Sequence, residues 1–358
     1  MKLGIIGLPG RGKTTVFRAL TGGIDSADHR GGQHEPAIGV VKVHDSRLDF
    51  LVDYQKPKKV TPVHVEYLDI AGITGEGKPG RSIGDKVLAH IRPLDALVHC
   101  VRFFDSSSLG DPHPLRDFKA VEEEMILTDL AVVEKRLERV GKDFERGRKE
   151  LAEELHLLER ARSVLDEGKP LRLFPPSMES EKLRGFSFLS CKPQLVLINS
   201  GENKSRQEID AVLNRITDHL AGHPGIVLDY LYADTEAEIA RLSPEDAAEF
   251  LSEMQLEEGT KERITKTSFE LLNLIVFFTV GEPEARAWQL EKGKTAVKAA
   301  GTVHSDMERG FIRAEVVSFE DFKEAGSMAA AHKAGKVRLE GRDYVIRDGD
   351  IILFRFNV

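Results

Sequence analysis

The chain has 358 residues, 41% of them hydrophobic and 31% charged, with a formal net charge of −8 at pH 7. This length suffices for about two or three domains with cores of their own. The negative charge excludes diffuse electrostatic binding to nucleic acid, although not a local basic patch. No run approaches the roughly eighteen apolar residues of a transmembrane helix, and no charged leader opens the sequence. We therefore expect a cytoplasmic globular protein without membrane contact.

A complete P-loop pattern lies at the start of the chain. The apolar run from Leu3 to Ile6 predicts a strand, and the next eight residues match Gly-x-x-x-x-Gly-Lys-Thr. Such glycines let backbone N–H groups curl around phosphates, while the lysine reaches the β- and γ-phosphates and the threonine binds Mg²⁺. Lys13 is therefore expected to be catalytic and Thr14 to be a metal ligand. The residues expected to bind the phosphates are Gly7, Gly10, Arg11, Gly12, Lys13, Thr14 and Thr15.

Two glycine-rich stretches have the composition of nucleotide switches. Residues 21–33 are rich in glycine with little apolar content, and residues 74–84 are rich in glycine and lysine. Between them, a predicted strand ends at Asp69, which opens an Asp-x-x-Gly element. In this element the Asp69 carboxylate would hold Mg²⁺, and the catalytic Gly72 N–H would meet the γ-phosphate. Ile73 stands where many GTPases have the glutamine that orients the attacking water, so hydrolysis should be slow.

A long charged helical segment interrupts the predicted sheet. After a buried strand at 95–104, apolar residues recur at helical spacing from about residue 115 to residue 166, with a reversal point at Arg146-Gly147. We expect an antiparallel helical hairpin. Its other faces carry many Glu, Lys and Arg residues, which leaves a solvated surface and a binding surface equally open. His99 and Cys100, within the buried strand, are expected to be structural.

The base-recognition motif departs from that of GTPases. A predicted strand ends in Asn199-Ser200-Gly201-Glu202, where GTPases usually have Asn-Lys-x-Asp. A glutamate has a longer reach and a different angle than the aspartate that accepts from guanine, so selectivity for guanine should be weaker. A further strand at 225–231 leads into the expected base-contacting loop. The residues expected to bind the base are Asn199, Glu202, Tyr232, Ala233 and Asp234.

Together with these motifs, a tail of short strands and tight turns resembles the YchF/Obg-like ATPase family. The matching segments are 7–9, 69–72, 199–202, the hairpin, 286–288, 310–315 and 354–358. The resemblance implies an α/β fold: a P-loop NTPase with a doubly wound sheet, an inserted coiled-coil hairpin and a C-terminal β-grasp-like TGS domain. The implied domains are 1–114 and 191–273 for nucleotide binding, 115–190 for the hairpin and 274–358 for the TGS domain.

The resemblance also implies slow hydrolysis of ATP in place of GTP, a switch function and association with ribosomes. We therefore expect Mg²⁺ as the cofactor, ATP or alternatively GTP as the ligand, and a ribosome or RNA as the partner. Four features depart from the family pattern: Gly10-Arg11 replaces Asn-Val, Gln33 replaces the Mg²⁺-binding threonine, Tyr232-Ala233-Asp234 replaces Ser-Ala-Lys, and His113 alone represents the histidine loop.

Two functions remain open on these grounds. In the first, ATP and Mg²⁺ order the switches, the ordered state binds a translational partner, and slow hydrolysis releases it. In the second, which Gln33 and the altered base loop favour, the protein senses nucleotide but has lost hydrolysis. The intact P-loop and Asp69 argue against a purely structural scaffold.

Overall fold

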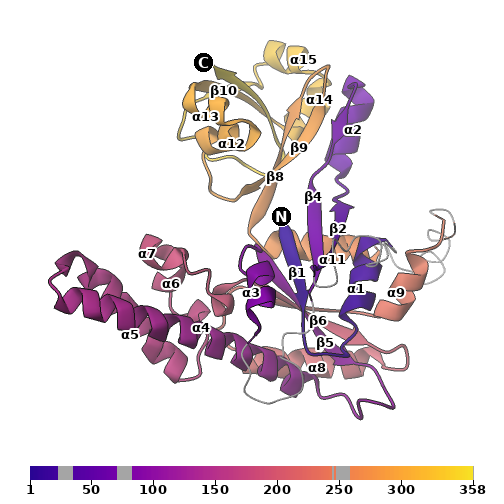
Figure 1. Cartoon of the computed structure of the whole chain (residues 1–358). Helices are drawn as coiled ribbons and strands as arrows, with labels where there is room; N and C mark the ends of the chain where they lie inside the picture. The colour runs from indigo at the N-terminus through magenta and orange to yellow at the C-terminus, as the bar shows by residue number, and fades with distance from the viewer. Residues whose placement is uncertain (23–34, 71–82, 244–245, 247–258, 358) are drawn as a thin grey trace. The chain divides into compact units, whose positions relative to one another are not determined.

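The computed structural model describes all residues except 23–34, 71–82, 244–245, 247–258 and 358, and it forms two compact units (Figure 1). The first unit comprises Met1–Val41 and Glu66–Thr267, and the second comprises Lys42–Val65 and Ser268–Val358. The predictions for Gln33, Gly72 and Ile73 lie outside the described residues. Among the helices that are described, none has the length and apolar character needed to cross a membrane.

A six-stranded sheet organises the first unit. Its order is β2-β4-β1-β5-β6-β7, and β1 pairs in parallel with both β4 and β5, as do β5 with β6 and β6 with β7. This is the doubly wound α/β fold that the sequence predicted. The strands are β1 (Lys2–Ile6), β2 (Ala37–Lys42), β4 (His64–Asp69), β5 (Ala96–Phe103), β6 (Gln194–Ser200) and β7 (Ile226–Leu231).

Helices pack against this sheet. Apolar side chains of α3, α4 and α8 pack against the strands in two clusters, one around Leu97 and Val121 and the other around Val101 and Phe118. His99 is buried and stacks on Phe118 with ring centroids 5.4 Å apart, and burial lowers its pKa to about 4. The helices are α1 (Lys13–Thr21), α3 (Asp85–Ile91), α8 (Arg206–His219), α9 (Ala233–Ile239) and α11 (Thr260–Leu271).

The predicted hairpin consists of α4 (Pro114–Glu145) and α5 (Ala152–Asp166), which lie side by side in Figure 1. The chain reverses at Gly147, whose φ of 99° favours glycine. Leu158, Ala161 and Leu165 of α5 pack against Val133 and Val140 of α4 in one apolar cluster. The return to the sheet contains four short helices, η2 (Leu171–Leu173), α6 (Pro176–Glu179), α7 (Glu181–Arg184) and η3 (Leu189–Cys191), and η1 (Lys149–Leu151) precedes α5.

Buried charged groups fasten the hairpin to the sheet. Arg172 donates to Glu122 Oε2 at 2.5 Å, and the Gln194 amide donates to Glu122 Oε1 at 2.6 Å. Farther along α4, the buried Asp129 accepts hydrogen bonds from the Leu189 and Ser190 backbone N–H groups at 2.9 and 2.8 Å. These bonds join residues far apart in sequence, so the base of the hairpin has a defined position on its own unit.

The second unit contains a mixed sheet of order β11-β10-β12-β8-β9-β3. Its two adjacent strands β12 and β8 are parallel, whereas β8 pairs with β9, and β10 with both β11 and β12, in antiparallel fashion. This agrees with the predicted small β-grasp-like fold. The strands are β8 (Leu274–Val280), β9 (Ala285–Glu291), β10 (Phe311–Ser318), β11 (Arg338–Glu340) and β12 (Asp350–Phe356), and the helices are α12 (Ala296–Val303), α13 (Ser305–Arg309), α14 (Phe319–Ala325) and α15 (Met328–Lys333).

An early segment of the chain completes this second unit. Helix α2 (Ser46–Gln55) begins after Asp45, whose side chain accepts from the Arg47 N–H, and strand β3 (Val60–Thr61) pairs in parallel with β9. Arg47 of α2 forms an ion pair of 2.6 Å with Asp348, and the Phe50 ring meets Phe319 edge to face at 5.6 Å. The sequence reasoning did not assign this segment to the tail. The four-part domain division itself stays a prediction.

Candidate functional site

The predicted phosphate loop joins β1 to α1. Gly7, Gly10 and Gly12 have φ angles of 146°, 73° and 81°, and a Cβ at Gly7 would lie 2.5 Å from the Cys100 carbonyl oxygen. Only glycine fits these positions without strain. Lys13 is buried at the start of α1, where its Nζ donates to the carbonyls of Gly7 and Leu8 at 3.2 and 3.0 Å. Desolvation lowers the pKa of Lys13. The ammonium is therefore held at the mouth of the loop by groups it can exchange for phosphate oxygens.

The two predicted metal ligands lie together. Thr14 Oγ1 donates to Asp69 Oδ2 at 2.8 Å, which joins the start of α1 to the end of β4. Hydroxyl and carboxylate oxygens are the hard ligands that Mg²⁺ prefers, with phosphate and water completing its shell. The residues present therefore fit Mg²⁺ bound with a nucleotide. No group of three or more His, Cys, Asp or Glu side chains able to hold a metal occurs elsewhere among the described residues.

Asn199 connects the phosphate loop with the predicted base loop. Its Nδ2 donates to the Arg11 carbonyl at 3.2 Å, and its Oδ1 accepts from the Ala233 N–H at 3.4 Å. Asn199 is almost fully buried, and a Cβ at Gly12 would lie 2.3 Å from its Nδ2. Three segments that the sequence singled out separately thus meet at one side chain.

A pocket of about 490 Å³ is lined by Ser200 and Gly201, which directly follow Asn199. Glu202, Tyr232 and Asp234, all predicted to contact the base, line it. Glu202 accepts a hydrogen bond from Thr235 at the start of α9, which fixes its carboxylate at the pocket wall. Sequence reasoning missed the other residues that line the pocket: Phe104, Asp105, Ser200, Gly201, Asn203 and Thr235. The position of Phe104 and Asp105 directly after a buried parallel strand was a usable signal, since ligands bind at the carboxyl ends of such strands.

Arg102 organises the loop that follows β5. This fully buried side chain donates to the carbonyls of Gly110 and Asp111 at 2.9 and 2.8 Å. Leu109 from the same loop lies over the phosphate loop, because a Cβ at Gly10 would be 2.9 Å from its Cδ1. His113 is exposed and directly precedes α4. Its position alone gives it no catalytic role.

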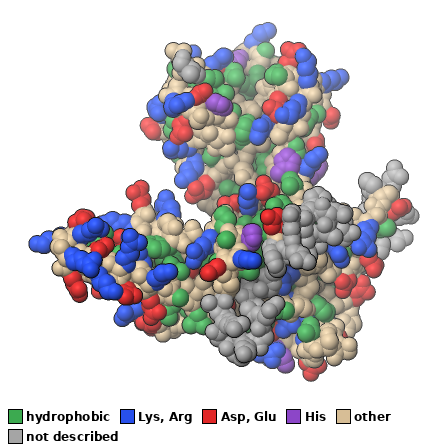
Figure 2. Space-filling model, viewed as in Figure 1, with side chains coloured by type: hydrophobic (Ala, Val, Ile, Leu, Met, Phe, Trp, Pro, Cys, Tyr) green, Lys and Arg blue, Asp and Glu red, His purple; other side chains and the backbone are tan. Residues whose placement is uncertain are grey.

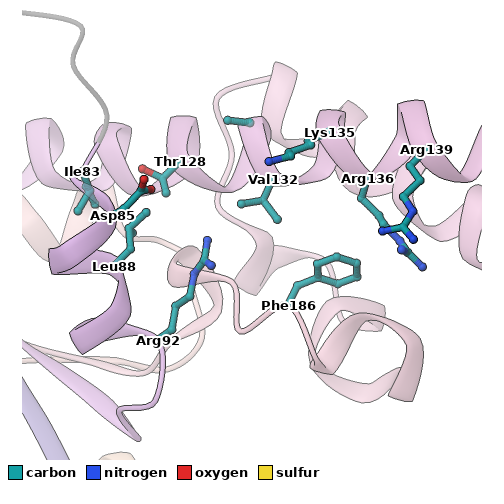
Figure 3. A pocket seen from close by; sticks show the side chains of 11 residues that line it. Ile83, Asp85, Leu88, Arg92, Thr128, Val132, Lys135, Arg136, Arg139 and Phe186 are labelled. Atoms are coloured by element: carbon teal, nitrogen blue, oxygen red, sulfur yellow. The ribbon is translucent and has the colours of Figure 1, made fainter.

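A second groove, also of about 490 Å³, lies between α3 and α4. Figure 3 shows Arg92 and Phe186 facing α4 across this space, with Arg136 and Arg139 on the α4 side. Arg136 pairs with Glu154 at 2.7 Å, whereas Arg92, Lys135 and Arg139 form no ion pair with any residue that the structure describes. Asp85 also lines the groove, but the four cations outnumber it and give the groove a local positive charge in an acidic protein. Figure 2 also shows Lys and Arg gathered over the hairpin, with Asp and Glu among them.

Two family models match the chain. One, described as a 50S ribosome-binding GTPase, matches residues 2–136, and the YchF GTPase C-terminal model, described as a protein of unknown function, matches residues 274–357. The ribosome-binding ATPase YchF of Bacillus subtilis is 40% identical over 362 residues, which cover 99% of each chain. The chain belongs to the YchF family. The YchF protein of Haemophilus influenzae is 39% identical over 100% of this chain and 99% of its own.

A solved structure places the same fold on both units. The YchF GTPase of Schizosaccharomyces pombe superposes with a TM-score of 0.82 at 30% identity, over 99% of this chain and 97% of that one. Obg-like ATPase 1 of Oryza sativa subsp. japonica is 35% identical over 100% of this chain and 92% of its own. Membership of the YchF family therefore rests on the whole length of the chain.

Proposed function

We propose that this protein is a P-loop ATPase that acts as a slow molecular switch on the ribosome. The observation that carries this proposal is the junction at Asn199, which joins the predicted phosphate loop to the predicted base loop. Lys13 and Thr14 lie at the phosphate end of this junction, and Asp69 accepts from Thr14. The names of the relatives from B. subtilis and H. influenzae, ribosome-binding ATPases, support the ribosome as partner.

The pocket chemistry favours adenine. Guanine presents two adjacent donors that a fixed aspartate accepts, whereas Glu202 is longer and is already bonded to Thr235. Phe104 supplies an aromatic face on which a base can stack. The base loop 232–234 offers backbone groups beside Asn199, which suit the exocyclic amine of adenine.

Charge stabilisation would supply most of the rate acceleration. When bound with the nucleotide, Mg²⁺ would neutralise negative charge on the phosphates. Lys13 would stabilise the charge that develops on the transferring phosphoryl group, and the backbone N–H groups of the loop would hold the chain of phosphates. Without a glutamine that orients water, turnover should be slow. Thr14 and Asp69 would hold the metal.

The base assignment is tested by changing Glu202→Asp and measuring equilibrium binding of fluorescent ATP and GTP analogues with and without Mg²⁺. We expect the wild-type protein to bind ATP more tightly in a Mg²⁺-dependent way and to release phosphate slowly. In the variant the ratio of ATP to GTP affinity should fall about tenfold or more, since a carboxylate at aspartate length suits the guanine donors. Glu238→Asp, on the exposed side of α9, is the control and should leave the ratio unchanged.

Two results would contradict the proposed function, one for the role of Glu202 and one for hydrolysis. An unchanged ratio in the Glu202→Asp protein would mean that Glu202 does not read the base. Tight ATP binding that ignores Mg²⁺ and releases no phosphate would instead identify a nucleotide sensor that has lost hydrolysis.

We further propose that the groove between α3 and α4 contacts ribosomal RNA. A phosphodiester backbone fits its unpaired cations. The test combines Arg92→Glu, Lys135→Glu and Arg139→Glu and measures RNA binding by fluorescence anisotropy over a range of salt concentrations. Affinity should fall sharply, and the log–log salt slope should decrease by about two, at roughly 0.7 for each lost phosphate contact.

The control carries the same change of charge on the hairpin but outside the groove, as Arg146→Glu, Lys149→Glu and Arg162→Glu. It should retain most of the RNA affinity and the steeper slope. Equal losses of RNA affinity in the two triple variants would show that binding depends only on the net charge of the protein. The groove would then not be the RNA contact. ATP hydrolysis serves as the folding check for both proteins.

A further inference from the structure

Beneath the phosphate loop, Arg11 forms a buried ion pair with the first turn of α4. Its Nε lies 2.7 Å from Asp117 Oδ2, and the two side chains are only 11% and 3% exposed. In the sequence pattern of the YchF/Obg-like ATPases, valine occupies the position of Arg11. The buried pair is therefore a feature of this chain that the family pattern does not require.

The main chain of Arg11 is fixed as firmly as its side chain. Its carbonyl accepts from Cys100 Sγ at 3.0 Å and from Asn199 Nδ2 at 3.2 Å. Gly10 and Gly12, on either side, have the positive φ angles that turn the loop around the phosphates. Any change in the loop on nucleotide binding therefore moves Arg11, and the Asp117 carboxylate must follow or the buried pair must break.

Helix α4 can carry such a movement away from the nucleotide. It is a single helix of 32 residues, which at 1.5 Å per residue extends over roughly 48 Å. Its far end forms the tip of the hairpin, at the reversal around Gly147. A small tilt at Asp117 thus becomes a larger displacement at the tip.

We propose that Arg11 and Asp117 are positioning residues that transmit nucleotide occupancy of the phosphate loop to α4 and the hairpin. This inference rests on the proposed nucleotide binding at the loop but goes beyond it. The pair would set the orientation of α4 according to the state of the loop.

The test is backbone hydrogen–deuterium exchange in the full-length protein, with and without a saturating non-hydrolysable ATP analogue and Mg²⁺. In the wild-type protein the nucleotide should slow exchange in the first turns of α4. In Asp117→Asn and Arg11→Val proteins, saturated with nucleotide, this α4 response should disappear, while the phosphate loop stays protected. Nucleotide affinity should weaken about tenfold, a typical coupling between sites.

Matched variants separate positioning from folding. Arg116→Met removes an exposed arginine that lies 3.5 Å from the other oxygen of Asp117, and it should keep the full α4 response. If a single variant is unstable, the combined Arg11→Val and Asp117→Leu protein removes both charges of the pair and should fold while still lacking the response. A preserved α4 response in that protein would overturn the inference.

The outcomes also distinguish this inference from the proposed function. Wild-type protein that binds nucleotide without any change at α4 would overturn the link but leave the ATPase proposal standing. Wild-type protein that binds no nucleotide would overturn the ATPase proposal itself.

Discussion

Replacement of Lys13 by alanine should reduce the rate of ATP hydrolysis by about 10² to 10³, the usual cost of removing one transition-state charge donor. Lys13 is the buried cation at the mouth of the phosphate loop, and its Nζ already lies 3.0 Å from the Leu8 carbonyl. The methyl group of alanine carries no charge and cannot stabilise the negative charge that develops on the phosphates. The measurement is phosphate release at saturating ATP, together with the dissociation constant of the nucleotide.

The control for this prediction is Lys2→Ala. Lys2 is an exposed lysine whose Nζ pairs with Glu66 at 3.3 Å on the surface of the sheet, and its loss should not affect turnover. Undiminished phosphate release by the Lys13→Ala protein would show that the observed hydrolysis does not occur at this loop. It would count against the ATPase proposal as a whole.

Replacement of Arg172 by methionine should destabilise the first unit by about 3–5 kcal/mol, because it leaves a buried carboxylate without its cation. Arg172 and Glu122 are 2% and 7% exposed and lie 2.5 Å apart. Burial by itself would raise the pKa of Glu122, but Arg172 and Gln194 outweigh it, and the pKa lies below its ordinary value. The measurement is the free energy of unfolding in denaturant.

The stability lost in the Arg172→Met protein should depend on pH. In the wild-type protein the lowered pKa of Glu122 makes a stabilising contribution that is present above its unfolded value near 4.5 and is lost as the pH falls below it. In the Arg172→Met protein burial should raise that pKa, so its folded state gains stability as the pH falls. The difference between the two proteins should therefore widen from pH 5 to pH 8.

An exposed pair provides the comparison. Arg162→Met removes a partner of Asp166 on α5, where both side chains are about half exposed, and it should cost less than about 1 kcal/mol. A similar small loss for Arg172→Met, constant with pH, would mean that water reaches Glu122 and that the pair does not fasten the hairpin.

The parts of the site that sequence could predict are local patterns with a fixed geometry. The glycines of the phosphate loop must adopt positive φ angles wherever the pattern occurs, so Lys13 and Thr14 follow directly. Asp69 and Asn199 could also be placed, since parallel strands bring their carboxyl ends to one edge. In the structure Asp69 accepts a hydrogen bond from Thr14, and Asn199 donates one to the Arg11 carbonyl.

The parts that sequence could not predict depend on contacts between distant residues. Arg102 lies within an apolar strand, and nothing in that run distinguishes a residue that holds a loop from a core residue. The Arg11–Asp117 pair joins two residues with no shared motif. Segment 42–65 was missed for the same reason, because its helix and short strand find their partners only near the end of the chain.

The separation of segment 42–65 from its partner strands affects how the protein folds during synthesis. The second unit combines residues 42–65 with residues from 268 onward, so about 200 residues are translated between its two parts. At roughly 5–20 residues per second, the early segment waits about 10–40 s for its partner strands. Through this interval the apolar side of α2, which includes Leu48 and Leu51, lacks the sheet it packs against in the finished protein. The nascent chain is thus exposed to aggregation or to chaperone binding at a helix close to its N-terminus until translation is nearly complete.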